Sequence, residues 1–143
     1  MTRGFSRRNT FLAMALLVFL PFSSAGGQEI DRLNEVNPGV EFSSVSRAYP
    51  DMNARYARVG AEHSIVQVRR IAIGQSQSDL QALLGRPATS YGDGSFEFHL
   101  SLPLTRRDRL ICQYRVFFDG AGKVERAIWR RPQCAELVLG QLN

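Results

Sequence analysis

The chain is 143 residues long and carries 18 basic side chains, 13 acidic side chains and two cysteines. Three of the basic residues are Arg3, Arg7 and Arg8, whereas all 13 acidic residues lie further along the chain. Without the first 25 residues the balance is 15 basic to 13 acidic, a net charge of +2, which argues against a nucleic-acid-binding protein. The remaining length, about 118 residues, suits one domain with a modest core.

The first 25 residues have the three-part order of a secretory signal peptide. After the basic start come an apolar run, Phe11–Phe22, and the small residues Ser23-Ser24-Ala25, which predict cleavage after Ala25. The run is 12 residues long, shorter than the ~20 residues that a bilayer span needs, so a retained anchor is the weaker alternative. No cysteine follows the run, so lipid attachment is not expected. The general secretory and twin-arginine export routes both stay open, because Arg7-Arg8 fits the second only approximately.

Residues 26–60 are predicted to form a flexible, weakly ordered linker. Asn37-Pro38-Gly39, Ser43-Ser44 and Tyr49-Pro50 interrupt every hydrophobic periodicity in this stretch. From residue 61 the composition changes, and apolar residues recur at helical spacing. They predict a short amphipathic helix that begins near Ser64 and stops by Gly74, with an apolar face of Ile65, Val68, Ile71 and Ala72.

The clearest local signal predicts a second helix over residues 77–84. Ser76 offers a capping hydroxyl, and Asp79 places a carboxylate three residues later. Gly85 suits a left-handed helix end, and Pro87 prevents continuation. The apolar stripe consists of Leu80, Leu83 and Leu84.

Three strands are expected next, over residues 96–102, 110–118 and 124–129. In the first, apolar residues alternate with polar ones, which predicts one buried face and places His99 on the open face. The segment Asp119-Gly120-Ala121-Gly122 predicts a tight hairpin between the other two. Apolar residues occupy both parities of these two strands, so the hairpin register stays open.

These elements predict an α+β domain over residues 61–134, followed by a C-terminal tail, residues 135–143. Short connections make the strands an antiparallel meander. Two amphipathic helices must bury their apolar stripes, and the apolar face of the sheet is the available surface. We therefore expect two short helices packed on a three-stranded antiparallel sheet (ααβββ), preceded by a signal peptide and a flexible tether.

Two cysteines in an exported chain favour a structural disulfide between Cys112 and Cys134. The alternative is a metal or thiol site that also uses His63 and His99, but no CxxC or HxxxH spacing supports it.

Asp93 and Glu97 could be paired carboxylates for hydrolysis, but a Gly-Asp-Gly turn explains Asp93 without chemistry. We therefore expect no catalytic residue, no cofactor and no metal.

Residues 71–87 resemble the signature of a known family. Ile71 is followed by two residues, Gly74, any residue, Ser76, a short spacer and an aliphatic residue, and the segment ends Leu-Gly-Arg-Pro. This order resembles the SmpA/OmlA family, the BamE-like outer-membrane assembly lipoproteins. Two later segments, Cys112–Asp119 and Trp129–Cys134, are similar to the version of that domain found ahead of peptidoglycan-binding domains. The resemblance covers about residues 59–134 and implies the same ααβββ fold.

The resemblance implies a non-enzymatic binding or scaffold protein of the cell envelope, accessory to outer-membrane protein assembly or to envelope integrity. It would reside in the periplasm, associated with the outer membrane, with outer-membrane assembly components or β-barrel proteins as partners. A competing class is an inhibitor-like module that binds a hydrolase through residues 91–94 and 105–109 on the same fold.

Partner contacts are expected from two arginine-rich stretches, against the alternative of a solvated loop and strand end. The arginines would suit anionic phospholipid head groups or acidic partners, and Trp129 is the best single candidate for an exposed contact. The candidate contact residues are Arg106, Arg107, Arg109, Trp129, Arg130 and Arg131.

Overall fold

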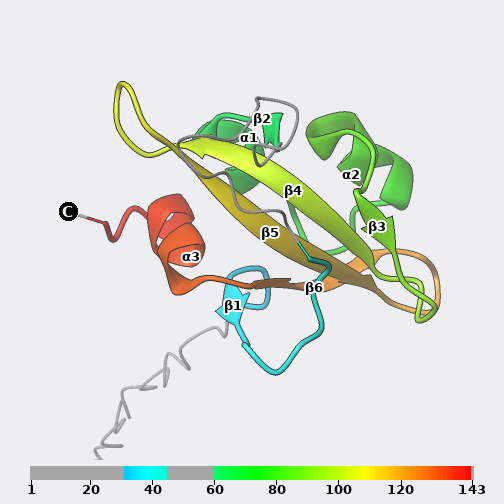
Figure 1. The fold of residues 1–143 in the computed structure, drawn as a ribbon. Helices are drawn as coiled ribbons and strands as arrows, with labels where there is room; N and C mark the ends of the chain where they lie inside the picture. Colours follow the sequence, from blue (N-terminus) through cyan, green and yellow to red (C-terminus); the bar gives the residue numbers. More distant parts are fainter. Residues whose placement is uncertain (1–30, 45–59, 143) are drawn as a thin grey trace, which may run out of the picture.

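A computed structural model of the chain describes residues 31–44 and 60–142; the predicted signal peptide, residues 1–25, lies outside these ranges. Within them, a twisted sheet is packed with three helices (Figure 1). The protein is therefore α+β, as the sequence predicts, although the numbers of helices and strands differ from the prediction.

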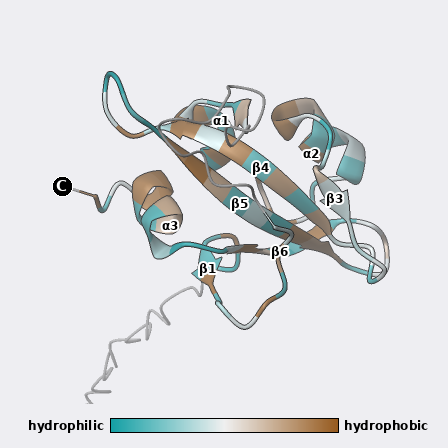
Figure 2. Ribbon diagram, in the orientation of Figure 1, coloured by the Kyte–Doolittle hydropathy of each residue, from teal (hydrophilic) through white to brown (hydrophobic). Residues whose placement is uncertain are grey.

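An antiparallel meander forms the centre of the sheet. Its strands are β4 (Phe96–Pro103), β5 (Arg109–Phe118) and β6 (Val124–Trp129), close to the three predicted strands. Alternation of polar and apolar residues is visible along β4 in Figure 2. The register that the sequence left open places Leu100 opposite Cys112, and Tyr114 opposite Trp129.

Three two-residue strands extend the meander into a mixed sheet, which corrects the prediction of a three-stranded antiparallel one. β1 (Glu35–Val36) runs parallel to β6, and β2 (Ala61–Glu62) runs parallel to β4. β3 (Thr89–Ser90) pairs antiparallel with β4. A strand of two residues is too short to show a period-two pattern, so the sequence contains no signal for it.

The two predicted helices form, and each begins at a capping serine. α1 (Ile65–Arg69) is capped by Ser64, whose hydroxyl accepts a hydrogen bond from the Gln67 amide at 3.1 Å. α2 (Gln77–Leu84) has the predicted bounds, and the Asp79 amide donates to the Ser76 hydroxyl at 3.1 Å. It ends at Gly85, whose φ of +80° and ψ of −162° lie outside the predicted left-handed helical region. The positive φ still favours glycine, because glycine has no Cβ.

A third helix, α3 (Pro132–Leu139), replaces most of the predicted C-terminal tail. Its sequence signals are Pro132 in the first turn and Gly140 at the left-handed C-cap, with φ of +74°. The buried residues between them, Cys134, Ala135 and Val138, recur at helical spacing and pack into the core. The disulfide anchors this helix to β5, so its position depends on a contact distant in sequence.

Residues 31–44 belong to the domain, which corrects the prediction of a weakly ordered linker for this part of residues 26–60. The Ala127 amide donates to the Arg32 carbonyl at 2.7 Å, and the Tyr114 hydroxyl donates to the Leu33 carbonyl at 2.7 Å. These contacts are made to residues more than 80 positions away, so no local pattern could indicate them.

All three helices share one core with one face of the meander. This face carries Phe98, Leu100 and Leu102 of β4, each at most 1% exposed. Leu80 and Leu84 of α2 belong to the same buried core. The other face of the same strands presents the intervening residues, and several of these are polar.

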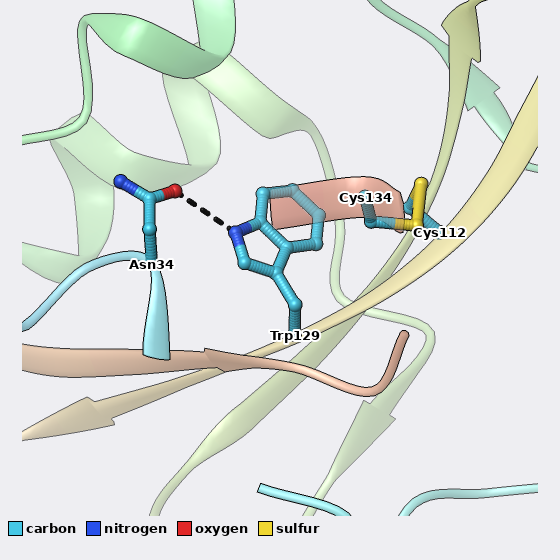
Figure 3. The surroundings of a disulfide bond; sticks show 4 residues. All are labelled: Asn34, Cys112, Trp129 and Cys134. Carbon is cyan, nitrogen blue, oxygen red and sulfur yellow. Dashed lines mark hydrogen bonds between the residues drawn. A yellow bond between two sulfur atoms is a disulfide. The ribbon is translucent and has the colours of Figure 1, made fainter. Parts of the chain in front are cut away.

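The predicted disulfide joins Cys112 of β5 to Cys134 of α3, with the two Cα atoms 5.8 Å apart (Figure 3). Both cysteines are fully buried in the shared core. This bond takes both sulfur atoms out of the alternative metal or thiol site.

Candidate functional site

The second face of the meander carries a row of polar side chains, which we call the polar strip: Ser95, Glu97, His99, Gln113 and Arg115. His99 is half-buried, and the other four are buried. Glu97 faces Arg115 across β4 and β5, and His99 faces Gln113. Glu97 is 0% exposed, and Gln113 and Arg115 are each 6% exposed. Buried charges of this kind require partners, and the structure supplies them from distant segments.

Glu97 accepts hydrogen bonds from five donor groups. The Tyr91 hydroxyl donates at 2.5 Å, the Gln113 amide at 3.1 Å, and the Ser43 backbone N–H at 2.8 Å. The Ser43 hydroxyl and the His99 ring nitrogen Nε2 also contact the carboxylate. The carboxylate is therefore fully satisfied in the ionised form.

These donors determine the protonation of Glu97. Burial alone would raise its pKa, but hydrogen bonds from His99, Ser43 and Tyr91 outweigh it and lower the pKa to about 2. A general base works best with a pKa near the working pH, so this carboxylate is poorly suited to accept a proton. The alternative of an acid–base pair made by Asp93 and Glu97 gains no support from this geometry.

Arg115 makes polar contacts with three residues and also lies over an aromatic ring. Its Nε donates to the Ser95 hydroxyl at 2.8 Å, and its Nη2 pairs with an Asp93 carboxylate oxygen at 3.0 Å. Its Nη1 donates to the Glu41 carbonyl at 2.7 Å, and the guanidinium lies 3.6 Å from the centre of the Tyr91 ring. Hydrogen bonds from Ser95, with a smaller contribution from Arg115, lower the pKa of Asp93.

Gln113 links the strip to a surface arginine. Its side-chain amide nitrogen donates to the Ser43 carbonyl at 2.7 Å as well as to Glu97. Its side-chain oxygen accepts from Arg130 Nη1 at 2.6 Å. Arg130, a predicted contact residue, is thus partly engaged in orienting the strip.

Residues 40–44, which we call the clasp, lie against the polar strip. The contacts involve the main chain of Glu41 and both the main chain and the hydroxyl of Ser43. Glu41 and Ser44 are exposed, whereas Phe42 and Ser43 are half-buried. The strip therefore holds an extended stretch of the chain mainly through its backbone.

The prediction for Trp129 is wrong. Its side chain is 0% exposed, stacks on Tyr114 with ring centres 4.0 Å apart, and donates from Nε1 to the Asn34 side chain at 2.9 Å (Figure 3). Val124 and Ala127 of the same strand are also buried, on the helix-covered face. The sequence predicts an exposed tryptophan because it indicates neither the helix α3 nor the packing of residues 31–44 on the domain, and these two segments cover Trp129.

The predicted arginines are not gathered into one site. Arg106 and Arg107 are exposed at the tip of the β4–β5 hairpin, where Asp108 accepts a hydrogen bond from Thr105. Arg109 begins β5 next to this loop, and its Nη2 donates to the Ser101 carbonyl at 2.7 Å. Arg130 and Arg131 follow β6, beside the start of α3.

A surface groove of about 350 Å³ lies between α1, α3 and residues 31–34. Arg69 fixes one wall, because its Nε donates to the Val138 carbonyl at 2.6 Å. The apolar part of its lining comprises Leu33, Val68, Ile71, Val138 and Leu139.

In the described ranges, no group of three or more His, Cys, Asp and Glu side chains is placed to hold a metal ion. No described helix is long and apolar enough to cross a bilayer.

Sequence reasoning missed the polar strip because it treated that face of the sheet as open to solvent. A partial signal existed: Gln113 and Arg115 interrupt the apolar strand 110–118 at alternate positions. Without the register of β4 and β5 it could not be known that they face His99 and Glu97.

Comparison with known proteins gives little further information. No protein-family profile matches the chain, and no curated protein matches it. Among solved structures, a chain described as the osmotically inducible lipoprotein OsmE is 22% identical, with a TM-score of 0.37. That alignment covers 52% of this chain and 84% of the other. The score is too low to establish a shared fold, so nothing about that lipoprotein is transferred to this chain.

Proposed function

We propose that this protein is a non-enzymatic binding or scaffold module of the bacterial cell envelope, accessory to outer-membrane protein assembly. It acts in the periplasm after removal of residues 1–25, and its partners are assembly components or β-barrel proteins. The proposal rests on the resemblance of residues 71–87 to the SmpA/OmlA signature.

The observation that carries the proposal is the conformation of this motif segment. Ser76 caps α2, Gly85 ends it, and Leu80 and Leu84 pack on the meander. The motif residues therefore set the two ends of α2 and bury its apolar face, which supports the resemblance on which the proposal rests. The order of two helices and then three main strands is also the order that the resemblance implies.

The chemistry of the polar side chains supports a binding role. The carboxylates of Glu97 and Asp93 have hydrogen-bond partners and lowered pKa values, and both cysteines are in the disulfide. The hydroxyls of Ser64 and Ser76 cap helices. Each of these groups has a structural role that accounts for its position.

The β4–β5 hairpin tip is the surface through which we expect the partner to be contacted. Arg106 and Arg107 are exposed there beside Leu104, which is 44% exposed. Anionic lipid head groups or acidic protein surfaces would suit this combination of charge and apolar area.

Site-specific cross-linking in living cells tests the proposal. A photoreactive residue at Arg106 is expected to capture barrel-assembly components or outer-membrane proteins. The matched control places the same photoreactive residue at Lys123. Lys123 is in the β5–β6 turn, which lies at the other end of the meander (Figure 1). Deletion of the gene should also raise permeability to detergents and large antibiotics.

The inhibitor-like alternative predicts a different outcome. Cross-linking at Arg106 would then capture one soluble hydrolase, and the deletion strain would keep its permeability barrier. That pair of results would replace the assembly role with the inhibitor role.

A further inference from the structure

The polar strip forms hydrogen bonds with the backbone of an extended stretch of chain. Arg115 Nη1 binds the Glu41 carbonyl at 2.7 Å, and two residues later Gln113 Nε2 binds the Ser43 carbonyl at 2.7 Å. Glu97 accepts the Ser43 backbone N–H at 2.8 Å and also contacts its hydroxyl. Three of these four contacts use main-chain atoms, so most of the recognition does not depend on which side chains the clasp carries.

The clasp covers polar groups, whereas the preceding residues cover apolar ones. Leu33 packs against the core, and Asn34 binds the buried Trp129. Beneath the clasp lie Glu97, Gln113 and Arg115, which water can solvate when the clasp leaves. Exchanging such hydrogen bonds for bonds to water costs less than exposing the apolar core, so the clasp is the part of residues 31–44 that can detach without disrupting the core.

An empty strip is nevertheless unfavourable inside the folded domain. Two of the five donor groups on Glu97 come from Ser43, and Arg115 also loses its Glu41 acceptor. Another extended segment with the same spacing of N–H, hydroxyl and carbonyl groups would restore all of these bonds. Recognition through main-chain hydrogen bonds is a common mode of peptide binding.

We propose that the polar strip is a binding site for an extended peptide segment of a partner protein, and that the clasp is its built-in occupant. The partner segment presents a serine or threonine where Ser43 lies, with a free backbone N–H at that residue and a carbonyl two residues earlier. This binding mode holds whether or not the partner belongs to the outer-membrane assembly machinery.

A competition experiment on the full chain tests the site. The probe is a fluorescent peptide with the sequence of residues 37–44, and the variant is Ser43→Pro, which removes the N–H and the hydroxyl from the clasp. The variant is expected to bind the peptide at least tenfold more tightly than the unaltered chain, because its own clasp no longer competes. Ser44→Ala, at an exposed neighbour, should bind as the unaltered chain does.

A second variant and an altered peptide locate the binding. Adding Gln113→Ala to Ser43→Pro should remove most of the gain, because Gln113 holds the Ser43 carbonyl. A peptide with proline at the position of Ser43 should not bind. Equal binding by Ser43→Pro and the unaltered chain, or binding unaffected by Gln113→Ala, would overturn the proposal.

Hydrogen exchange on the unaltered chain provides an independent measurement. The Ser43 amide should exchange at least tenfold faster than the Ala127 amide, which donates to the Arg32 carbonyl in the stable part of the segment. Equal protection of the two amides would contradict a detachable clasp.

Should Ser43→Pro fail to fold, Ser43→Ala is the substitute in the peptide-binding experiment. It should still raise the affinity for the peptide at least threefold over that of the unaltered chain.

Discussion

Replacing Glu97 by glutamine should destabilise the protein in a pH-dependent way. The substitution keeps the shape of the side chain and removes its charge, and it also directs an NH₂ group toward donors. In the folded state the pKa of Glu97 is lowered from 4.5 to about 2. A difference of that size corresponds to roughly 3 kcal/mol of stability at neutral pH, a substantial fraction of the roughly 5–15 kcal/mol typical of a folded domain.

The sign of the pH dependence follows from the lowered pKa. The contribution of Glu97 is fully present above the pKa of the unfolded chain, near 4.5, and is lost as the pH falls through about 2. The unaltered chain should therefore exceed Glu97→Gln in unfolding free energy by about 3 kcal/mol at pH 7. By pH 2 the difference should fall below about 1 kcal/mol, because about half of the native glutamate is then protonated and little of the linkage free energy remains.

Urea unfolding followed by tryptophan fluorescence measures this difference, since Trp129 is the single tryptophan and is buried. The matched control is Glu125→Gln, at an exposed position of β6, which should change stability by less than about 0.5 kcal/mol at every pH. A destabilisation by Glu97→Gln that is equally large at pH 7 and pH 2 would refute the reasoning. It would show that shape or packing, and not the charge, accounts for the effect.

Three other substitutions test the fold. Cys112→Ser should lower the unfolding free energy by about 3 kcal/mol, because the disulfide spans 22 residues. Thiol titration of the unaltered chain, denatured but not reduced, should find no free thiol, and two free thiols would contradict the pairing. Leu80→Ala should lower the unfolding free energy by about 2–5 kcal/mol, whereas Val66→Ala, at a 67% exposed site on α1, should change it by less than about 0.5 kcal/mol. Equal losses of unfolding free energy would mean that α2 does not bury its apolar stripe. Gly85→Ala should cost about 1–3 kcal/mol, because the φ of +80° and ψ of −162° lie in a region almost restricted to glycine. Nothing lies within 4 Å of the added carbon, so a neutral effect would argue against that backbone conformation.

The elements that the sequence predicted well are those specified by neighbouring residues. Ser76, Asp79 and Gly85 lie within ten positions of one another, and together they define both ends of α2. The alternation of apolar residues similarly located β4, and the glycines after Asp119 located the β5–β6 turn. In each case the stabilising contacts are local, so the pattern can be read without knowing the tertiary structure.

Tertiary contacts decided the remainder of the fold. The two-residue strands β1 and β2 form only because other strands lie beside them, and a pair of residues carries no periodicity. α3 has its own end signals, yet its place in the core depends on the disulfide to Cys112 and on Trp129 being covered. The predicted exposure of Trp129 failed for this reason.

The polar strip shows the same division between local and distant information. The sequence contains Glu97, Gln113 and Arg115 at alternate positions of two predicted strands, and this places them on faces of the sheet but does not pair them. The register of β4 and β5 brings Glu97 opposite Arg115, and a segment more than 50 residues earlier supplies Ser43. A carboxylate that local sequence would leave exposed to water is thereby buried and ionised, because its donors come from segments that only the folded chain brings together.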